Sequence, residues 1–259
     1  MRSADDPTSP LTRSGAGRSD VGDRRLTREM LFGIECVSID VGGVLLRPPF
    51  SRIRRALRGT VEPSDSALER ALYVDEEDTN LGLAPGETDR SERFLRLYAT
   101  TLGVGIADVE HVLEPLRAAM FHPVWEPRRL AEDRAALQRL RARNRKLAIV
   151  TNAEGQAARV LSDAGVCQVG AGRGAQVDTV IDSGVVGYYK PDPRIYELVV
   201  ERLGVRPEAI LHIGDSVRND VLPAREVGFS AAHFDPFDDC RSAEHPHVQS
   251  LAEIADAVL

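Results

Sequence analysis

Cysteine is scarce in this chain, and its scarcity excludes several classes of protein. The 259 residues contain three cysteines, at positions 36, 167 and 240, which are odd in number and widely spaced. This pattern excludes a disulfide framework and a cysteine-rich zinc knuckle, and it indicates a reducing, cytoplasmic setting.

Long hydrophobic runs are also missing. No apolar run approaches the roughly 18 residues of a membrane span, so we expect no membrane partner.

Positive charge is scarce as well. The formal net charge is −7, so no overall basic field attracts nucleic acid, and we expect no nucleic-acid partner. Lysine occurs only at positions 146 and 190, while arginine supplies the remaining basic residues. The first 30 residues are poor in bulky apolar side chains, which predicts a disordered tail over residues 1–30.

Hydrophobic patterns in the remainder of the chain predict an α/β protein. Residues 34–41 (IECVSIDV) have the composition of a short buried strand, and residues 51–120 show apolar residues at helical spacing. Strand and helix patterns then alternate, with strands expected at 146–152, 177–183, 209–216 and 230–235. This alternation predicts a Rossmann-like parallel sheet with helices on both faces. We therefore expect a core of residues 31–47 and 122–259, into which a helical subdomain of residues 48–121 is inserted.

Polar residues follow the predicted strands at the points where the strands end. Asp40 ends the first strand, Thr151 and Asn152 end the second, and Asp215 ends a later one. Lys190 follows the third strand in GYYKPDP. Because the carboxyl ends of parallel strands meet at one edge of a sheet, we expect these side chains to lie together. A carboxylate there can attack phosphorus, and carboxylate oxygens are ligands that Mg²⁺ prefers.

Four stretches occur in the order typical of one family: SIDVGGVLL, AIVTN, Lys190 in GYYKPDPRIY, and LHIGDSVRND. In this respect the chain resembles the haloacid dehalogenase superfamily, whose members are mostly phosphatases. The resemblance implies that Asp40 is the nucleophile and that the helical insertion is a cap over the site. GETDRSERFLRLYATTLG, within that insertion, resembles a stretch of sugar-phosphate-type phosphatases. We therefore expect a small phosphorylated metabolite as substrate.

The resemblance also implies roles for the remaining site residues. Mg²⁺ would be held by Asp40, Asp215 and the backbone carbonyl of Gly42, and Asp220 would hold the metal's waters or orient Lys190. The transferring phosphoryl oxygens would be bound by Lys190, the Thr151 hydroxyl, and backbone amides after Asp40, with Gly43 as a substrate-binding residue, and at Asn152. We expect Gly42 and Gly43 to let the backbone turn tightly beside the phosphate.

One residue of the family pattern is missing. Phosphatases of the family usually carry a second aspartate two positions after the nucleophile, as general acid and base, and here Gly42 stands at that position. We favour a Mg²⁺-dependent phosphatase that works without this aspartate. Its substrate would have a leaving group of low pKa, which needs little protonation, or a water or a cap group such as His122 would replace the aspartate as acid and base. A 2-haloacid dehalogenase would not need the acid, but its fourth motif differs from GDSVRND. A phosphonoacetaldehyde-type hydrolase needs a cap lysine, which is lacking between residues 47 and 130. A catalytically silent binding protein is the remaining alternative.

A second group of polar residues lies outside these motifs. The stretch EHPH at 244–247 carries two histidines that could bind a metal ion, but we interpret it as a polar loop.

Overall fold

The computed structural model describes residues 25–74, 90–242 and 244–257. Most of the predicted tail, residues 1–24, lies outside the described residues. Residues 28–31 form a turn, Arg25 forms an isolated bridge with His247, and Leu26 packs against the main core. The fold therefore includes residues that we had placed in the tail.

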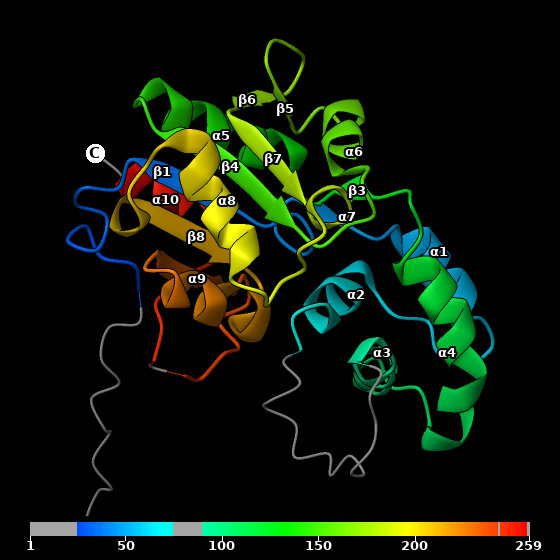
Figure 1. The fold of residues 1–259 in the computed structure, drawn as a ribbon. Coiled ribbons are helices and arrows are strands. Elements are labelled where there is room, and N and C mark those ends of the chain that lie inside the picture. The colour runs from blue at the N-terminus through cyan, green and yellow to red at the C-terminus, as the bar shows by residue number, and fades with distance from the viewer. Residues whose placement is uncertain (1–24, 75–89, 243, 258–259) are drawn as a thin grey trace, which may run out of the picture.

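A six-stranded sheet forms the centre of the molecule, and its strand order is β10-β9-β8-β1-β4-β7. Figure 1 labels β8, β1, β4 and β7 of this sheet. All neighbouring strands are parallel. The strands are β1 (Cys36–Ile39), β4 (Lys146–Thr151), β7 (Thr179–Asp182), β8 (Ile210–Gly214), β9 (Ser230–Phe234) and β10 (His247–Val248). The predicted α/β class is confirmed, and β10 is a strand that the hydrophobic pattern did not predict.

Helices cover both faces of this sheet because successive side chains of a strand point to opposite faces. Val37 and Ile39 of β1 belong to one apolar cluster, whereas Cys36 belongs to another. The helices that pack on the first cluster are α5 (Leu130–Ala142), α6 (Ala157–Asp163) and α10 (Leu251–Ala257). Those on the second are α8 (Arg194–Leu203) and α9 (Leu222–Glu226).

Short elements complete the sheet domain. A two-stranded parallel pair, β5 (Cys167–Val169) and β6 (Ala175–Val177), flanks the glycine-rich stretch between them. The helix α7 (Ser183–Val186) follows β7, and a 3₁₀ turn (Pro207–Ala209) precedes β8. One turn of π-helix, Val217–Val221, follows β8 and leads into α9.

The described residues between positions 48 and 125 form four helices, which have an apolar core of their own. They are α1 (Phe50–Ala56), α2 (Asp65–Ala71), α3 (Arg90–Thr101) and α4 (Ile106–Met120). Ile53, Leu68, Tyr98 and Leu116 are fully buried in a cluster separate from the two clusters of the sheet. The insert lies beyond the carboxyl ends of β4 and β7, toward which their arrows point in Figure 1.

The chain enters and leaves this helical insert through a two-stranded antiparallel ribbon. Its strands are β2 (Leu46–Arg47) and β3 (Glu126–Pro127). Arg128, directly after β3, has its side chain buried, and its Nε donates to the Val44 carbonyl oxygen. The ribbon therefore anchors the insert beside the loop that follows β1.

Among the helices that the structure describes, none combines the length and the apolar character of a membrane-spanning segment.

Candidate active site

Four charged residues from separate parts of the chain meet at the carboxyl edge of the sheet. Asp40 follows β1, Asp215 follows β8, Asp220 lies in the π-helical turn, and Lys190 lies in the loop before α8. β8 and β1 are neighbours in the sheet, so the two strand ends are adjacent. Asp40, Lys190 and Asp220 are buried, and Asp215 is half-buried. The predicted convergence of these residues is thus present in the fold.

Lys190 contacts two of the three carboxylates. Its Nζ lies 2.7 Å from Asp40 Oδ1 and donates to Asp220 Oδ1 at 2.6 Å. Asp40, Asp215 and Asp220 each offer an oxygen, and these oxygens all lie within 4.8 Å of one another. The three carboxylates therefore lie close together, and the Lys190 ammonium contacts two of them.

The pKa directions at the site follow from this crowding. Burial raises the pKa of Asp215 well above its usual range, and the charges of Asp40 and Asp220 raise it further. Burial also raises the pKa of Asp40, although Lys190 opposes the shift. Burial opposes ionisation of Asp220 too, but Lys190 and His212 outweigh it and lower the pKa of Asp220.

The carboxylate cluster fits a divalent cation. Asp40 and Asp215 are oxygen donors of the kind that Mg²⁺ takes, and a cation between them would relieve their mutual repulsion. Asp220 is placed differently, because its Oδ1 accepts from Lys190 and its Oδ2 accepts from the Ser216 backbone N–H at 3.1 Å. Its position suits the orientation of Lys190 better than direct contact with a metal.

The two glycines after Asp40 differ in their surroundings. Gly43 has a φ of +69°, and a Cβ there would lie 1.9 Å from Asp215 Oδ2, so only glycine fits. Gly42 is not among the residues with positive φ, and a Cβ there would meet only the Trp125 ring at 3.9 Å. The expected need for glycine holds for Gly43, whereas Gly42 has room for a side chain.

The second motif contributes two residues at the end of β4. The Thr151 side chain is buried and lines a cavity at the sheet edge. Asn152 is exposed, and its side chain binds the backbone of Lys190 on both sides: its Nδ2 donates to the Lys190 carbonyl at 3.0 Å, and its Oδ1 accepts from the Lys190 N–H at 2.8 Å. Asn152 therefore holds the loop that carries Lys190.

A buried hydrogen-bond chain supports Asp220, and sequence reasoning missed it. His212 Nε2 lies 3.2 Å from Asp220 Oδ1, and His212 Nδ1 lies 2.9 Å from Ser38 Oγ. Ser38 and His212 are direct partners in the register of β1 and β8. The only sequence signal is a polar residue within each of two otherwise apolar strands.

Tyr73, which follows α2 of the insert, reaches the loop after β1. Its hydroxyl donates to the Gly43 carbonyl oxygen at 2.5 Å. The Tyr73 ring also lies against Phe234 at the end of β9, with 6.3 Å between ring centroids. The helical insert thus contacts the backbone close to Asp40, the candidate nucleophile. No sequence motif predicted this contact.

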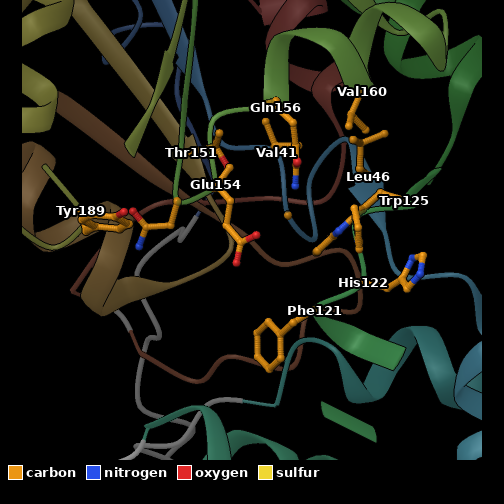
Figure 2. Close-up of a pocket in the computed structure, with 15 residues that line it drawn as sticks. Val41, Leu46, Phe121, His122, Trp125, Thr151, Glu154, Gln156, Val160 and Tyr189 are labelled. Atoms are coloured by element: carbon orange, nitrogen blue, oxygen red, sulfur yellow. The ribbon is translucent and has the colours of Figure 1, made fainter. Parts of the chain in front are cut away.

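A cavity of about 280 Å³ opens beside Gly42 and Thr151 (Figure 2). Apolar side chains form much of its wall, and its lining residues are Val41, Gly42, Leu46, Phe121, His122, Pro123, Trp125, Thr151, Asn152, Ala153, Glu154, Gln156, Ala157, Val160 and Tyr189. Both the sheet edge and the segment between α4 and β3 contribute to it. A small molecule bound there would lie next to the loop that follows Asp40.

Glu154 and His122 line this cavity in different ways. Figure 2 shows the Glu154 side chain directed toward the middle of the cavity and His122 on the far side of Trp125 from Thr151. His122 Nδ1 accepts a hydrogen bond from the Val124 N–H at 3.0 Å, so a neutral His122 carries its proton on Nε2. Glu154 is therefore better placed than His122 to meet a bound molecule.

Comparisons with known proteins identify the family of the chain. The family model described as "Hydrolase: haloacid dehalogenase-like hydrolase" matches residues 34–228. The human haloacid dehalogenase-like hydrolase domain-containing protein 3 is 30% identical over 210 residues, which cover 75% of this chain and 79% of that protein. The phosphoserine phosphatase of Thermus thermophilus is 36% identical over 104 residues, 40% of this chain and 39% of that enzyme.

A solved structure shares the fold. The crystal structure of a predicted phosphoglycolate phosphatase from Haemophilus somnus superposes with a TM-score of 0.57 at 15% sequence identity. The match covers 88% of this chain and all of the other (100%).

Proposed function

The chain belongs to the haloacid dehalogenase-like hydrolase family, and we propose that it is a phosphatase for a small phosphorylated metabolite that uses Asp40 as its nucleophile. The observation that carries this proposal is the Lys190–Asp40 ion pair, buried within a carboxylate cluster beside a cavity. The similarity to a phosphoserine phosphatase supports the same reaction class.

In the first chemical step, an Asp40 carboxylate oxygen attacks phosphorus and the bond from phosphorus to the leaving oxygen breaks. An aspartyl phosphate forms, and the leaving oxygen departs as an alkoxide that takes a proton from solvent to give the alcohol. In the second step, water attacks the same phosphorus, inorganic phosphate is released, and the Asp40 carboxylate is regenerated. The surroundings of Asp40 suit such a nucleophile, since burial strips its carboxylate of water and the Lys190 contact fixes its orientation.

Lys190 binds the transferring oxygens and also neutralises part of the carboxylate charge. Burial opposes its protonation, but Asp220 and Asp40 outweigh that effect and raise the pKa of Lys190, so it remains an ammonium. Asp220 and Asn152 position it through its Nζ and its backbone, respectively. The Thr151 hydroxyl and the backbone N–H of Asn152 complete the binding of the phosphoryl oxygens.

Asp40, Asp215 and the Gly42 carbonyl would hold Mg²⁺, which supplies positive charge between carboxylate and phosphate oxygens. Asp220, whose oxygens are engaged by Lys190, His212 and Ser216, supports the site from outside. The missing carboxylate at position 42 favours substrates whose leaving group needs little protonation, such as sugar 1-phosphates and acyl phosphates.

Replacement of Asp40 tests the proposal directly. We expect Asp40→Asn to lower the turnover of para-nitrophenyl phosphate with Mg²⁺ by at least about a thousandfold, with circular dichroism unchanged. Asp163→Asn, at an exposed aspartate of α6, is the matched control and should retain activity. A folded Asp40→Asn protein with more than a tenth of the wild-type rate would contradict the role of Asp40.

The 2-haloacid dehalogenase alternative makes a different prediction. A halide leaves without a proton, so the glycine at position 42 would be no handicap. The close cluster of Asp40, Asp215 and Asp220 favours the phosphatase, because these carboxylates suit a cation that halide displacement does not need. Turnover of 2-chloropropionate in EDTA, together with inactivity toward phosphate esters, would favour the dehalogenase.

A further inference from the structure

A second cluster of metal-ligating side chains lies at the carboxyl end of β9, and it shares no member with the catalytic carboxylates. It joins the end of the sheet to the loop before β10, and its four members are His233, Cys240, His245 and His247. Each offers a ligand atom, and the four atoms all lie within 4.8 Å of one another. We propose a structural zinc site with these four residues as its ligands.

The fold brings these residues together through a strand pairing. β10 runs parallel to β9, with His247 opposite His233, and the His233 N–H donates to the Pro246 carbonyl at 2.8 Å. The Cys240 sulfur lies 3.6 Å from His245 Nε2. In a tetrahedral zinc site, a sulfur and a nitrogen ligand are about 3.5 Å apart. Two of the four ligands thus have the spacing that a shared ion requires.

In two of the imidazoles, those of His247 and His233, one ring nitrogen lies near an acceptor, and this contact determines which nitrogen is left to bind a metal. His247 Nδ1 lies 3.3 Å from Asp235 Oδ2, while its Nε2 is buried and has no hydrogen-bond partner among the described residues. A carboxylate that accepts from one ring nitrogen leaves the lone pair on the other, which is the usual arrangement behind a metal-bound histidine. A buried nitrogen with a lone pair and no donor is costly unless an ion binds it.

His233 also has an acceptor on one of its ring nitrogens. Its Nε2 lies 3.0 Å from the Asp215 carbonyl oxygen, which can only accept, so Nε2 carries the proton. A neutral His233 therefore has its lone pair on Nδ1. Asp235 also accepts from the backbone N–H groups of Asp239 and Cys240, both at 3.0 Å, so one carboxylate orients both His247 and the Cys240 loop.

The ligand set selects the metal and its role. One thiolate and three imidazoles suit Zn²⁺ far better than Mg²⁺ or Ca²⁺, which take oxygen ligands. Four protein ligands fill a tetrahedral shell and leave no open position, which is typical of a structural zinc. On binding, the Cys240 thiol loses its proton to solvent, and the ion bridges β9 to the loop before β10. His233 links this bridge to the backbone of Asp215.

Metal content and cobalt spectroscopy test the site on the full chain. Dialysis against Zn²⁺ with excess Mg²⁺ should leave about one zinc per chain and raise the melting temperature by about 5–10 °C relative to chelated protein. Co²⁺ should give a thiolate-to-cobalt charge-transfer band and the intense visible bands of a tetrahedral complex. A wild-type protein without the thiolate band, or with no retained zinc, would overturn the proposal.

Variants separate this site from the catalytic carboxylates. Cys240→Ser should abolish the thiolate band, and His247→Ala should lose the zinc and the thermal shift. His111→Ala, at an exposed histidine of α4, is the matched control and should retain all three signals. Asp215→Asn should also retain the zinc. Loss of zinc in Asp215→Asn together with retention in His247→Ala would place the ion at the catalytic site and overturn the proposal.

Discussion

Gly42 and Gly43 follow the same strand, but their neighbours give them different tolerances to substitution. A Cβ at Gly43 would collide with the Asp215 carboxylate, whereas a Cβ at Gly42 would make ordinary contact with Trp125. Position 42 is therefore open to the carboxylate that the family usually carries there. An aspartate can therefore be introduced at position 42 to test whether the missing general acid limits the rate.

Gly42→Asp should restore general acid catalysis. For the wild type, we expect rates to depend steeply on leaving-group pKa, with sugar 1-phosphates and aryl phosphates ahead of primary alkyl phosphates. A positioned acid contributes about 10²–10⁴-fold, so Gly42→Asp should narrow the gap by accelerating the poor leaving groups most. Gly42→Asn is the matched control, because it has the same shape without the acid.

The measurement is kcat against leaving-group pKa at fixed pH and saturating Mg²⁺. A wild-type plot without slope would mean that the enzyme already protonates the leaving group. The proposal that Gly42 leaves it without a general acid would then be wrong. Glu154, which points into the cavity, would then be the first residue to replace.

At the scale of elements, the helical insert and the catalytic loop meet through Tyr73. The helices α1–α4 have an apolar core of their own, separate from the two apolar clusters of the sheet. The Tyr73 hydroxyl donates to the Gly43 carbonyl, and its ring packs against Phe234 and Phe237. This contact connects the position of the insert to the backbone beside Asp40.

Tyr73→Phe should lower kcat by about 3–10-fold, because it removes one hydrogen bond of roughly 0.5–1.5 kcal/mol while keeping the ring. Tyr98→Phe is the matched control. The Tyr98 hydroxyl also donates to a backbone carbonyl, that of Leu68, but within the core of the insert. We expect Tyr98→Phe to affect the melting temperature and not kcat. Equal kcat values for Tyr73→Phe and the wild type would show that this contact does not support catalysis.

At the scale of the whole molecule, the buried charge of an ionised Asp215 opposes stability. Burial raises the pKa of Asp215 well above its usual range, so an ionised Asp215 destabilises the fold. The cost is absent below the unfolded pKa of about 4 and is complete above the raised pKa. The ionised Asp215 carboxylate, which the proposed function requires as a Mg²⁺ ligand, therefore destabilises the metal-free fold.

Asp215→Asn should separate stability from activity. In EDTA at pH 7.5, we expect the variant to melt at a higher temperature than the wild type, because the buried charge is removed. Its phosphatase activity with Mg²⁺ should fall at least about a hundredfold. Mg²⁺ should raise the melting temperature of the wild type more than that of the variant. Full wild-type activity in EDTA would contradict the proposed role of the cation.

Asp133 provides a second test of buried charge, remote from catalysis. It lies in the first turn of α5, burial raises its pKa to about 6, and Arg128 opposes that shift. The destabilisation is absent below about pH 4 and complete above about pH 6. Asp133→Asn should therefore be more stable than the wild type by about 2–3 kcal/mol at pH 7.5, and equally stable near pH 4.

Urea unfolding of both proteins across this range measures the difference, in which the other titrating groups cancel. Asp163→Asn, at an exposed aspartate, should show a constant difference from the wild type. A pH-independent difference for Asp133→Asn would show that Asp133 ionises as readily in the folded chain as in the unfolded one.

The sequence by itself determined the α/β class, the helical insertion and the convergence of Asp40, Lys190 and Asp215. These follow from local signals, because hydrophobic periodicity defines each strand and the next polar residue must lie at the strand's end. The parallel arrangement then brings the strand ends to one edge. No further long-range information was needed for that part of the site.

Only the tertiary structure decided the remaining contacts between side chains of distant elements. The Ser38–His212 pair depends on the register of β1 with β8, and the Tyr73–Gly43 contact depends on how the insert packs. The cluster around Cys240 depends on the pairing of β10 with β9. β10 has two residues, too few for any periodicity to be recognised, so EHPH had the pattern of a polar loop. Strand register and packing between distant segments are global properties of the fold, and local patterns do not encode them.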